Sequence, residues 1–259
     1  MTRTYVVTGA ASGIGAATKA LLEDHGHRVI DVDLHNADVT GDLASPLGRA
    51  AIIKRIKNAA SDSLDGVITC AGLRAAAPDT ISVNFFGTVE LLEGLRPLLA
   101  KSPAPRAAVV SSLSSVSPQD PAIVDAALAG NEPLARAAVE ASRPDHTGRP
   151  RVYSSSKTAV SRWVRQNAIK AEWGGAGILL NAVAPGTVKT AMTTDVTASP
   201  EATASWLANL PNPQNRIGEA REIAAVLVWL ASAENSMILG QTVFADLGTE
   251  TLLRGDYVW

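Results

Sequence analysis

The sequence predicts one α/β domain, a doubly wound parallel sheet covered by helices on both faces. Two observations predict it: short β-branched runs alternate with longer Ala- and Leu-rich helical stretches through the N-terminal half, and a glycine-rich turn joins the first run to the first helical stretch. Alternating strands and helices favour parallel strands, because each helix carries the chain back to the edge where the last strand began. No change of composition divides the chain, so residues 1–259 are expected to form a single domain.

The expected strands are short and rich in Val, Ile and Ala, and they cover residues 4–8, 29–32, 67–69, 108–110, 178–183 and 242–245. The expected helices follow longer apolar periodicities, over residues 14–25, 46–60, 79–100, 152–173 and 218–232. Residues 187–214 combine Thr, Ser, Pro and Asn with a short helical piece around Trp206 and Leu207, which is typical of a mobile loop region.

Composition narrows the class of partner. The 23 basic and 25 acidic residues are interspersed, so the chain offers no electropositive surface for nucleic acid. Its apolar runs are of strand length and its N-terminus lacks a secretory pattern, so we expect no membrane span and a cytoplasmic location. A single cysteine, Cys70, and four scattered histidines predict no disulfide and no metal site. The expected partner is a small molecule.

A glycine turn directly follows the first expected strand. Gly9, Gly13 and Gly15 let the chain turn tightly and bring a helix N-terminus toward a pyrophosphate, although such a turn can also bind nothing. Asp33 ends the second strand, where an acidic residue either meets the adenosine ribose of a dinucleotide or simply faces water. Neither the turn nor Leu34 offers a basic partner for a 2′-phosphate, so NAD(H) is favoured over NADP(H).

Tyr153 and Lys157 are four residues apart on an expected helix, so their side chains share a face. The pair is either an ordinary surface contact or a proton donor beside a cation that tunes it. A free phenol has a pKa near 10, too high for a good general base at neutral pH, and a neighbouring ammonium favours the phenolate. In a functional pair, Lys157 is expected to lower the pKa of Tyr153.

Several short motifs follow one another in a specific order. They are the glycine turn, Thr69-Cys70-Ala71-Gly72, Val83-Asn84-Phe85-Phe86-Gly87, Val109-Val110-Ser111-Ser112, Tyr153 with Lys157, and Asn181 to Gly186 followed by Thr190. This order resembles the short-chain dehydrogenase/reductase family over nearly the whole chain. Within that family, the sequence most resembles the bacterial 3-alpha-hydroxysteroid dehydrogenase/carbonyl reductase branch. The resemblance implies a Rossmann-type fold.

The resemblance also implies a catalytic set: Ser112, Tyr153, Lys157 and Asn84. Tyr153 would exchange a proton with the substrate oxygen, and Ser112 would hold that oxygen. Lys157 would bind the nicotinamide ribose, and Asn84 would anchor a water that links Lys157 to solvent. The implied NAD-binding residues lie along the carboxyl edge of the sheet: Gly9, Ser12, Gly13, Ile14, Gly15, Asp33, Asp42, Leu43, Cys70, Ala71, Gly72, Tyr153, Lys157, Pro185, Gly186, Val188 and Thr190.

Some of these assignments have alternatives. Cys70 replaces a family asparagine and is expected to be an inert apolar residue rather than a nucleophile. Asp42 either contacts adenine or belongs to a turn that leads into a helix. The strand end that carries Ser112 holds three more serines, and only the motif selects among them: Ser111, Ser114 and Ser115. The three serines between Tyr153 and Lys157 are interpreted as helix filler: Ser154, Ser155 and Ser156.

The stretch between Ser112 and Tyr153 is much longer than is usual in the family, which implies an insertion at about residues 117–150. Glu132, Arg136 and Glu140 recur every four residues there and indicate an inserted helix. The insertion would lie beside the helices that usually build the family's tetramer interface. A homodimer through the last helix and strand is therefore expected, with a tetramer as the alternative.

Residues 187–214 resemble the segment that closes over substrate in the family. Its apolar residues either line the pocket or are ordinary packing: Met192, Trp206, Leu207 and Leu210. A pocket lined by them would take a small hydrophobic alcohol or ketone of steroid, terpenoid, alicyclic or aryl type. The tail, residues 249–259, would either cover the site of a neighbouring subunit or pack on the surface.

The expected function is NAD(H)-dependent interconversion of a hydrophobic secondary alcohol and its ketone by hydride transfer, with Tyr153 as the acid and base. Two alternatives remain: a dehydrogenase of another small alicyclic alcohol or diol, and a non-catalytic dinucleotide sensor, since a fold does not fix function. The joint presence of Ser112, Tyr153 and Lys157 favours an enzyme.

Overall fold

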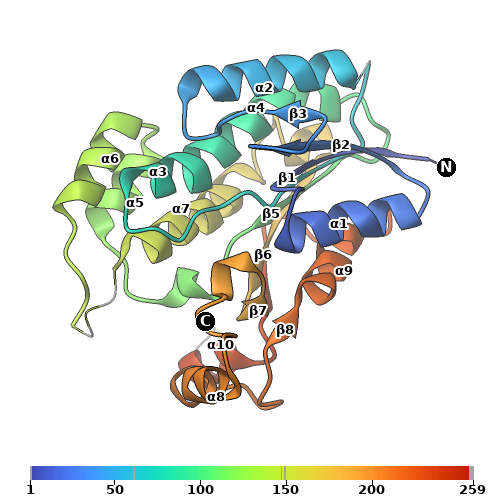
Figure 1. Cartoon of the computed structure of the whole chain (residues 1–259). Coiled ribbons are helices and arrows are strands. Elements are labelled where there is room, and N and C mark those ends of the chain that lie inside the picture. The colour runs from blue at the N-terminus through green and yellow to red at the C-terminus, as the bar shows by residue number, and fades with distance from the viewer. Residues whose placement is uncertain (1, 61, 147, 149, 257–259) are drawn as a thin grey trace.

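The computed structural model describes residues 2–60, 62–146, 148 and 150–256, and in this part of the chain seven parallel strands form the central sheet (Figure 1). In order across the sheet they are β3 (Val39–Thr40), β2 (Arg28–Asp33), β1 (Thr4–Thr8), β4 (Gly66–Thr69), β5 (Arg106–Val110), β6 (Leu179–Pro185) and β9 (Thr242–Ala245). The order reverses between β1 and β4. In sheets of this type, ligands bind beyond the carboxyl ends of the strands at that point.

Helices cover both faces of the sheet. On one face α1 (Gly13–Asp24) packs against α9 (Ala220–Leu230), while α2 (Pro46–Ala59), α4 (Thr88–Leu99) and α7 (Val152–Asn167) cover the other (Figure 1). Because side chains alternate along a strand, Val6 packs in one apolar cluster and Val7 in the other. Burial on both faces explains why the strands are mostly apolar. The predicted doubly wound α/β fold is confirmed.

The helix expected over residues 79–100 is not one regular helix. α3 (Pro78–Ile81) runs into a π-helical segment, η1 (Ser82–Gly87), which continues into α4. The π-helical segment is buried along its whole length and carries Asn84. Single π turns inside α-helices are frequent at functional sites, and apolar periodicity does not reveal them.

α7 ends at Asn167, earlier than the predicted end at residue 173. The Asn167 side chain donates to the Trp163 carbonyl at 2.8 Å and accepts from Lys170 Nζ at 2.7 Å. The chain then turns and buries Trp173 completely, with its ring edge-on to Trp163 at 5.8 Å between centroids. Burial of a large aromatic side chain therefore outweighs continuation of the helix.

The inserted helix predicted from Glu132, Arg136 and Glu140 is confirmed as α6 (Glu132–Ala141), and a second helix, α5 (Pro121–Leu128), precedes it. Gly130 has a φ of 71°, a left-handed conformation that ends α5 at little cost for glycine. The side chain of Asn131 then accepts a hydrogen bond from the Leu134 N–H and caps the start of α6.

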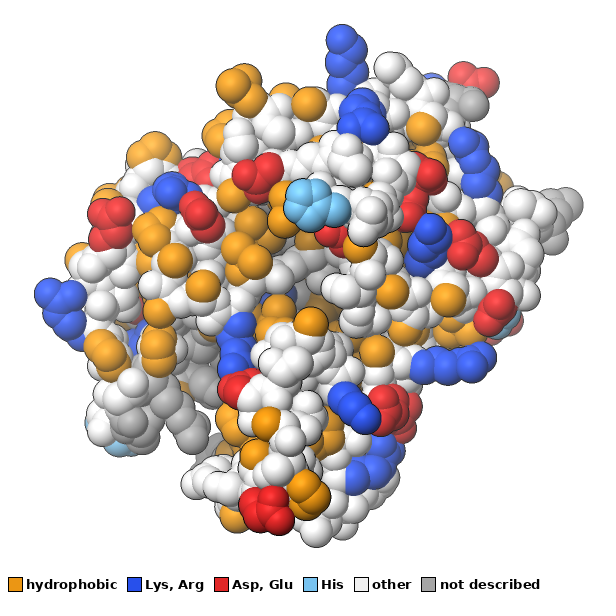
Figure 2. All heavy atoms as spheres, viewed as in Figure 1, with side chains coloured by type: hydrophobic (Ala, Val, Ile, Leu, Met, Phe, Trp, Pro, Cys, Tyr) orange, Lys and Arg blue, Asp and Glu red, His pale blue; other side chains and the backbone are white. Residues whose placement is uncertain are grey.

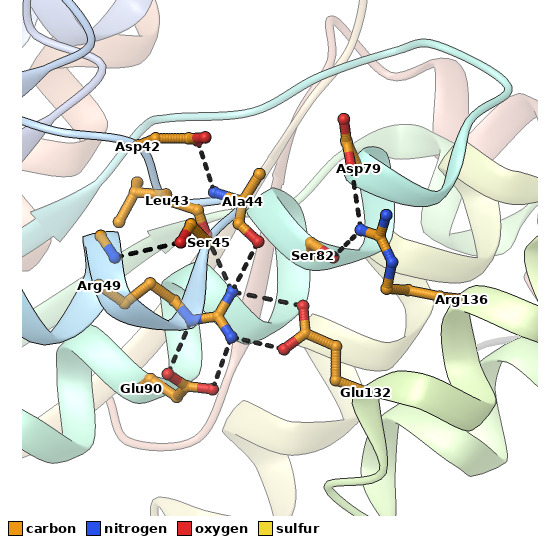
Figure 3. A network of polar contacts seen from close by, with 11 residues as sticks. Asp42, Leu43, Ala44, Ser45, Arg49, Asp79, Ser82, Glu90, Glu132 and Arg136 are labelled. Carbon is orange, nitrogen blue, oxygen red and sulfur yellow. Dashed lines mark hydrogen bonds and ion pairs between the residues drawn. The ribbon is translucent and has the colours of Figure 1, made fainter.

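Two arginines anchor α6 to the rest of the fold (Figure 3). Arg49 on α2 is fully buried and pairs with Glu90 on α4 and with Glu132 at the start of α6. Arg136 on α6 pairs with Asp79 on α3 at 2.9 Å. α5 packs along α7. The insertion therefore covers the outer side of α3 and α7.

The segment over residues 187–214 is more regular than the loop that was expected. It contains β7 (Val188–Lys189), which pairs with β8 (Gly218–Glu219), then a short 3-10 helix, η4 (Ala191–Thr193), and α8 (Pro200–Asn209). The helical piece predicted around Trp206 and Leu207 is confirmed as part of α8.

The C-terminal segment begins with α10 (Thr249–Arg254), which follows β9. Tyr257, Val258 and Trp259, which end the tail expected to cover a neighbouring subunit or pack on the surface, lie outside the described residues. Of the helices in the described part of the chain, none combines the length and apolarity needed to cross a membrane.

Candidate active site

Ser112 and Tyr153 meet beyond the carboxyl end of β5. Ser112 lies two residues after that strand, opens the 3-10 helix η2 (Leu113–Val116), and accepts a hydrogen bond from the Ser114 N–H at 3.1 Å. Its hydroxyl lies beside the Tyr153 phenol and, as a hydrogen-bonding partner, lowers the pKa of that phenol. Ser111 points elsewhere: its hydroxyl donates to the Lys157 carbonyl at 3.1 Å and contacts Ser161 Oγ at 2.7 Å. Of these two neighbouring serines, it is therefore Ser112 that contacts the tyrosine.

Lys157 is buried one helical turn after Tyr153. Its Nζ donates to the Val110 carbonyl at 2.8 Å and lies 5.8 Å from the centre of the Tyr153 ring. A Cβ placed on Gly72 would lie 3.6 Å from Nζ, so the absence of a side chain at Gly72 leaves room beside the ammonium. Burial lowers the pKa of Lys157 to about 8, because a charged ammonium loses hydration there.

The Tyr153 phenol does not have the lowered pKa that was expected from Lys157. Burial raises the pKa of Tyr153, while the hydrogen bond from Ser112 and the positive charge of Arg74 oppose that rise. Lys157 is itself strongly desolvated, and its Nζ is bonded to the Val110 carbonyl. The expectation that Lys157 lowers the pKa of Tyr153 is therefore wrong for the protein without ligand. The charge that opposes the rise in the pKa of the phenol is that of Arg74.

The side-chain amide of Asn84 forms hydrogen bonds to two neighbouring segments of the chain. Its amide accepts from the Leu73 N–H at 2.8 Å and donates to the Leu73 carbonyl at 2.9 Å, so it clamps the loop after β4. The same amide nitrogen donates to Ser156 Oγ at 2.9 Å. A Cβ on Gly72 would lie 3.2 Å from Asn84 Oδ1 and close to Lys157. Asn84 thus joins the loop after β4 to the helix that carries the tyrosine and lysine.

The interpretation of Ser154, Ser155 and Ser156 as helix filler was wrong, because all three are buried and hydrogen-bonded. Ser154 donates to the Pro118 carbonyl at 2.6 Å, and Ser155 accepts from the Asp120 N–H at 2.8 Å. Ser156 meets Asn84, as described. The serines therefore fix the start of α7 against the insertion and the π-helical segment, which fixes the place of Tyr153.

The glycine turn packs against the end of β4. Gly9 has a φ of 67°, and a Cβ there would lie 2.8 Å from Ala71 N, so only glycine fits. Thr8 Oγ1 accepts from the N–H groups of Cys70 and Ala71, each at 3.1 Å, and ties the two strand ends together. Cys70 is partly buried in the apolar cluster around α1 and α9, and desolvation of its thiol raises the pKa to about 12, in keeping with the expected inert role.

α1 presents an open N-terminus directly after this turn. Ser12 is its N-cap residue, yet its side chain makes no capping bond, and the first turn holds no acidic residue. A Cβ on Gly13 would lie 3.3 Å from Thr190 Cγ2, so the residues after β7 reach the same turn. Free N–H groups at a helix N-terminus bind anions, and this arrangement fits the pyrophosphate of a dinucleotide.

The two predicted adenosine contacts have different surroundings. Asp33 accepts from the Ala11 N–H of the glycine turn at 2.9 Å and from the Leu34 N–H at 2.7 Å, so its carboxylate lies at the turn. Asp42 accepts from the Ala44 N–H at 2.8 Å, which is the helix-leading turn named as its alternative. Leu43, beside it, is buried, and Arg49 Nη1 donates to its carbonyl at 3.0 Å.

The predicted substrate residues are not all gathered at one place. Met192 is exposed, Leu207 is buried, and the Trp206 indole donates to Thr187 Oγ1 at 2.8 Å. Only Leu210 among them lines the pocket of about 290 Å³ between β7, β9 and α9, together with Gly186. Figure 2 shows that the face in view is hollowed near its middle, with apolar, basic and acidic side chains interspersed around it.

The sequence analysis missed Leu73 and Arg74, which follow Gly72 in the loop after β4. The Leu73 backbone forms two of the three hydrogen bonds described for the Asn84 side chain, which no side-chain pattern reveals. Arg74 acts on Tyr153 and pairs with Asp195, a residue 121 positions away. The signal available was the position of Arg74 directly after a predicted cofactor-binding motif.

Comparisons with known proteins decide the family. Residues 9–250 match the family model described as enoyl-(acyl carrier protein) reductase. The chain is 35% identical over 255 residues to the 3-alpha-hydroxysteroid dehydrogenase/carbonyl reductase of Comamonas testosteroni, an alignment that covers 96% of this chain and 97% of that protein. The chain belongs to the short-chain dehydrogenase/reductase family. The resemblance predicted from the motifs is thereby confirmed, and the protein is an oxidoreductase.

Two further members of the short-chain dehydrogenase/reductase family show how widely substrates vary around this fold. The galactitol 2-dehydrogenase (L-tagatose-forming) of Cereibacter sphaeroides is 34% identical over 93% of this chain and 92% of its own. The crystal structure of the 3-alpha-hydroxysteroid dehydrogenase from Pseudomonas sp. B-0831 complexed with NADH shares 35% identity, with a TM-score of 0.87 over 98% of this chain and 99% of that one.

Proposed function

We propose that the protein is an NAD(H)-dependent dehydrogenase that interconverts a hydrophobic secondary alcohol and its ketone. The observation that carries the proposal is the placement of the Ser112 hydroxyl beside the Tyr153 phenol and the buried Lys157. Ser112 follows β5, whereas Tyr153 and Lys157 share α7, and the two segments bring the three groups together at the carboxyl edge of the sheet. A dinucleotide sensor would have no need for a phenol held against a serine at that place.

The hydroxyl groups of Ser112 and Tyr153 would both donate a hydrogen bond to the same oxygen atom of the substrate. Ser112 Oγ accepts from the Ser114 N–H, so its own hydrogen can turn from the Tyr153 phenol to the oxygen of a ligand placed between the two hydroxyls. Both hydroxyls would then donate to the carbonyl oxygen of a ketone, with Ser112 stabilising the developing negative charge and Tyr153 transferring its proton. In alcohol oxidation Tyr153 removes that proton. When bound, the nicotinamide dinucleotide supplies the hydride chemistry.

The residues for the cofactor fit a dinucleotide without a 2′-phosphate. The open N-terminus of α1 would hold the pyrophosphate, and the buried Lys157 would bind the nicotinamide ribose beside Gly72. Asp33 lies at the glycine turn, where its carboxylate would accept from the ribose hydroxyls and repel a 2′-phosphate. The NADH complex of the Pseudomonas relative supports NAD(H) as the cofactor.

The experiment that tests the function is turnover of NADH against a panel of steroid, terpenoid, alicyclic and aryl ketones, with the Tyr153→Phe variant alongside. We expect the variant to lose turnover by about 100-fold or more, the scale of a lost proton-transfer group, and to keep its affinity for NADH. Ser161→Ala, on the same helix, is the matched control and should keep turnover. Comparable rates for wild type and Tyr153→Phe would exclude Tyr153 as the proton donor.

Asp33→Ala tests the choice of cofactor. Loss of the carboxylate removes both the ribose acceptor and the repulsion of a 2′-phosphate, so the ratio of kcat/KM for NADH over NADPH should fall by about tenfold or more. The same panel, run with both cofactors, gives this ratio. An unchanged ratio would mean that Asp33 does not select the cofactor.

We also propose a homodimer formed through α9 and β9. α5 and α6 cover the outer side of α3 and α7, whereas Trp229 on α9 is 43% exposed and Met237, shortly before β9, is 90% exposed. Light scattering should then give the mass of two chains, and a mass of four would show that the insertion does not prevent a tetramer. The cytoplasmic location stays a prediction.

A further inference from the structure

Arg74 lies two residues after Gly72, which adjoins Lys157 and Asn84, and the backbone before it is held in place by its neighbour. The preceding residue, Leu73, is clamped at both its N–H and its carbonyl by the buried Asn84 amide, so the backbone that leads to Arg74 has a defined position. The charge of Arg74 reaches the Tyr153 phenol, where it opposes the rise in pKa caused by burial. The guanidinium is therefore within electrostatic range of the atom at which the proposed chemistry takes place.

Asp195 holds Arg74 from the other side of the site. It follows η4 in the segment 187–214, and its Oδ2 accepts from Arg74 Nη2 at 2.7 Å. The two side chains are 38% and 60% exposed, so breaking the pair leaves neither charge buried without water. Within the described part of the chain Arg74 donates this single hydrogen bond, although a guanidinium has five N–H groups and can bind a carboxylate with two of them.

We propose that Arg74 binds an anionic group, specifically a carboxylate, on the substrate, and that Asp195 occupies Arg74 until that carboxylate displaces it. The inference rests on the proposed function and names its substrate class: a hydrophobic ketone or secondary alcohol that carries a carboxylate away from the reacting carbon. Asp195 is then an internal stand-in for the substrate's acid group.

The surroundings of the pair suit such an amphiphilic molecule. Two apolar residues, each 36% exposed, flank the pair along the chain. Leu73 directly precedes Arg74 in the loop after β4, and Met192 lies in η4, three residues before Asp195. Apolar side chains beside one available guanidinium would bind a hydrophobic body and orient it through a single charged end. A neutral ketone could enter the same place, but it has no carboxylate to replace the contact between Arg74 and Asp195.

The test compares acids with their primary amides, which share shape and differ in charge. The pairs are oxocyclohexanecarboxylate, acetylbenzoate and a 3-oxosteroid side-chain acid, each against its amide, with NADH and the wild-type protein. We expect a higher kcat/KM for at least one acid than for its amide. Arg74→Gln should lower the ratio of kcat/KM for that acid over its amide by about tenfold or more, the scale of a lost charge-assisted hydrogen bond, since any effect of the Arg74 charge on Tyr153 is common to both substrates and cancels in the ratio. Arg74→Lys should restore part of the loss.

The Asp195→Asn variant distinguishes two roles of the Arg74–Asp195 pair: competition with the substrate's carboxylate, and closure of the segment 187–214 over the site. With the competing carboxylate removed, kcat/KM for the acid should rise, whereas loss of a contact needed to close the site would lower it for acid and amide alike. Arg136→Gln is the matched control, because Arg136 on α6 and Asp79 on α3 form an ion pair of nearly the same exposure, 39% and 60%. That variant should change neither substrate's kcat/KM.

Three outcomes would overturn the inference: no preference for acid over amide in any pair, an equal loss for both in Arg74→Gln, or a lower kcat/KM for the acid in Asp195→Asn. If no ketone is reduced by a wild-type protein that binds NADH, the proposed function fails. Calorimetric titration of the NADH-loaded protein with each acid and amide then still tests Arg74, since an acid should bind more weakly to Arg74→Gln and an amide equally, and equal affinities would refute the assignment.

Discussion

Two arginine–carboxylate contacts tie outer segments of the chain to the core, and they differ in nearly every physical respect. Arg49 joins the insertion to α2 and α4, and its side chain is 1% exposed between Glu90 and Glu132. Arg74 joins the segment after β7 to the loop after β4 through one hydrogen bond, and its side chain is 38% exposed. The difference teaches which of the two segments can move during turnover.

A buried guanidinium can be released only at the cost of leaving charges without water or partners. Arg49 also donates to the carbonyls of Leu43 and Ala44, so its release would disturb the start of α2 as well. An exposed pair exchanges protein contacts for water with little change in free energy. The insertion is therefore a permanent part of the fold, whereas the segment that carries Asp195 is held loosely enough to open for substrate.

The largest effect is expected for Arg49→Met. The variant removes a buried cation and leaves Glu90 and Glu132 facing each other, so the free energy of unfolding should fall by about 3 kcal/mol. Urea denaturation measures this, with Lys54→Met on the exposed side of the same helix as the control, which should stay within about 0.5 kcal/mol. If the free energy of unfolding fell by less than about 1 kcal/mol in Arg49→Met, the Arg49 contacts would contribute no more to stability than an exposed pair such as Arg74 and Asp195.

An intermediate effect is expected for Glu132→Gln. The amide keeps the shape of the side chain but weakens its hydrogen bonds to Arg49, so the free energy of unfolding should fall by about 1 kcal/mol. Hydrogen exchange of the α6 amides should become faster than in the wild type, since Glu132 starts that helix. Unchanged exchange in α6 would mean that the apolar contacts of the insertion hold it without the ion pair.

The smallest effect is expected for Asp195→Asn. Because both members of its pair are largely solvated, the free energy of unfolding should stay within about 0.5 kcal/mol of the wild type. Urea denaturation under the same conditions checks this. A loss as large as that of Glu132→Gln would show that the segment after β7 is fastened as firmly as the insertion.

The sequence was sufficient to predict the sheet, the helices on its faces and the gathering of Ser112, Tyr153 and Lys157. Those predictions depend on local periodicity and on motifs whose chemistry is carried by side chains. The glycine turn belongs to the same class, since Gly9 must approach the end of β4 and only glycine allows it.

The remainder of the site depends on partners that sequence patterns do not show. Ser154 and Ser155 bond to the backbone of Pro118 and Asp120, and the Asn84 amide bonds to the backbone of Leu73. Backbone atoms carry no residue identity, so such contacts leave no motif. The raised pKa of Tyr153 likewise follows from burial, which depends on the packed fold rather than on the spacing to Lys157.

The π-helical segment makes the site sensitive to the length of the chain. Asn84 lies inside η1, and successive residues of an ordinary α-helix are rotated by about 100° from one another. Loss of one residue between Ser82 and Gly87 would turn the segment into an α-helix and swing the Asn84 amide away from the Leu73 backbone. Homologous loops tolerate insertions and deletions readily, but at this turn the number of residues matters as much as their identity.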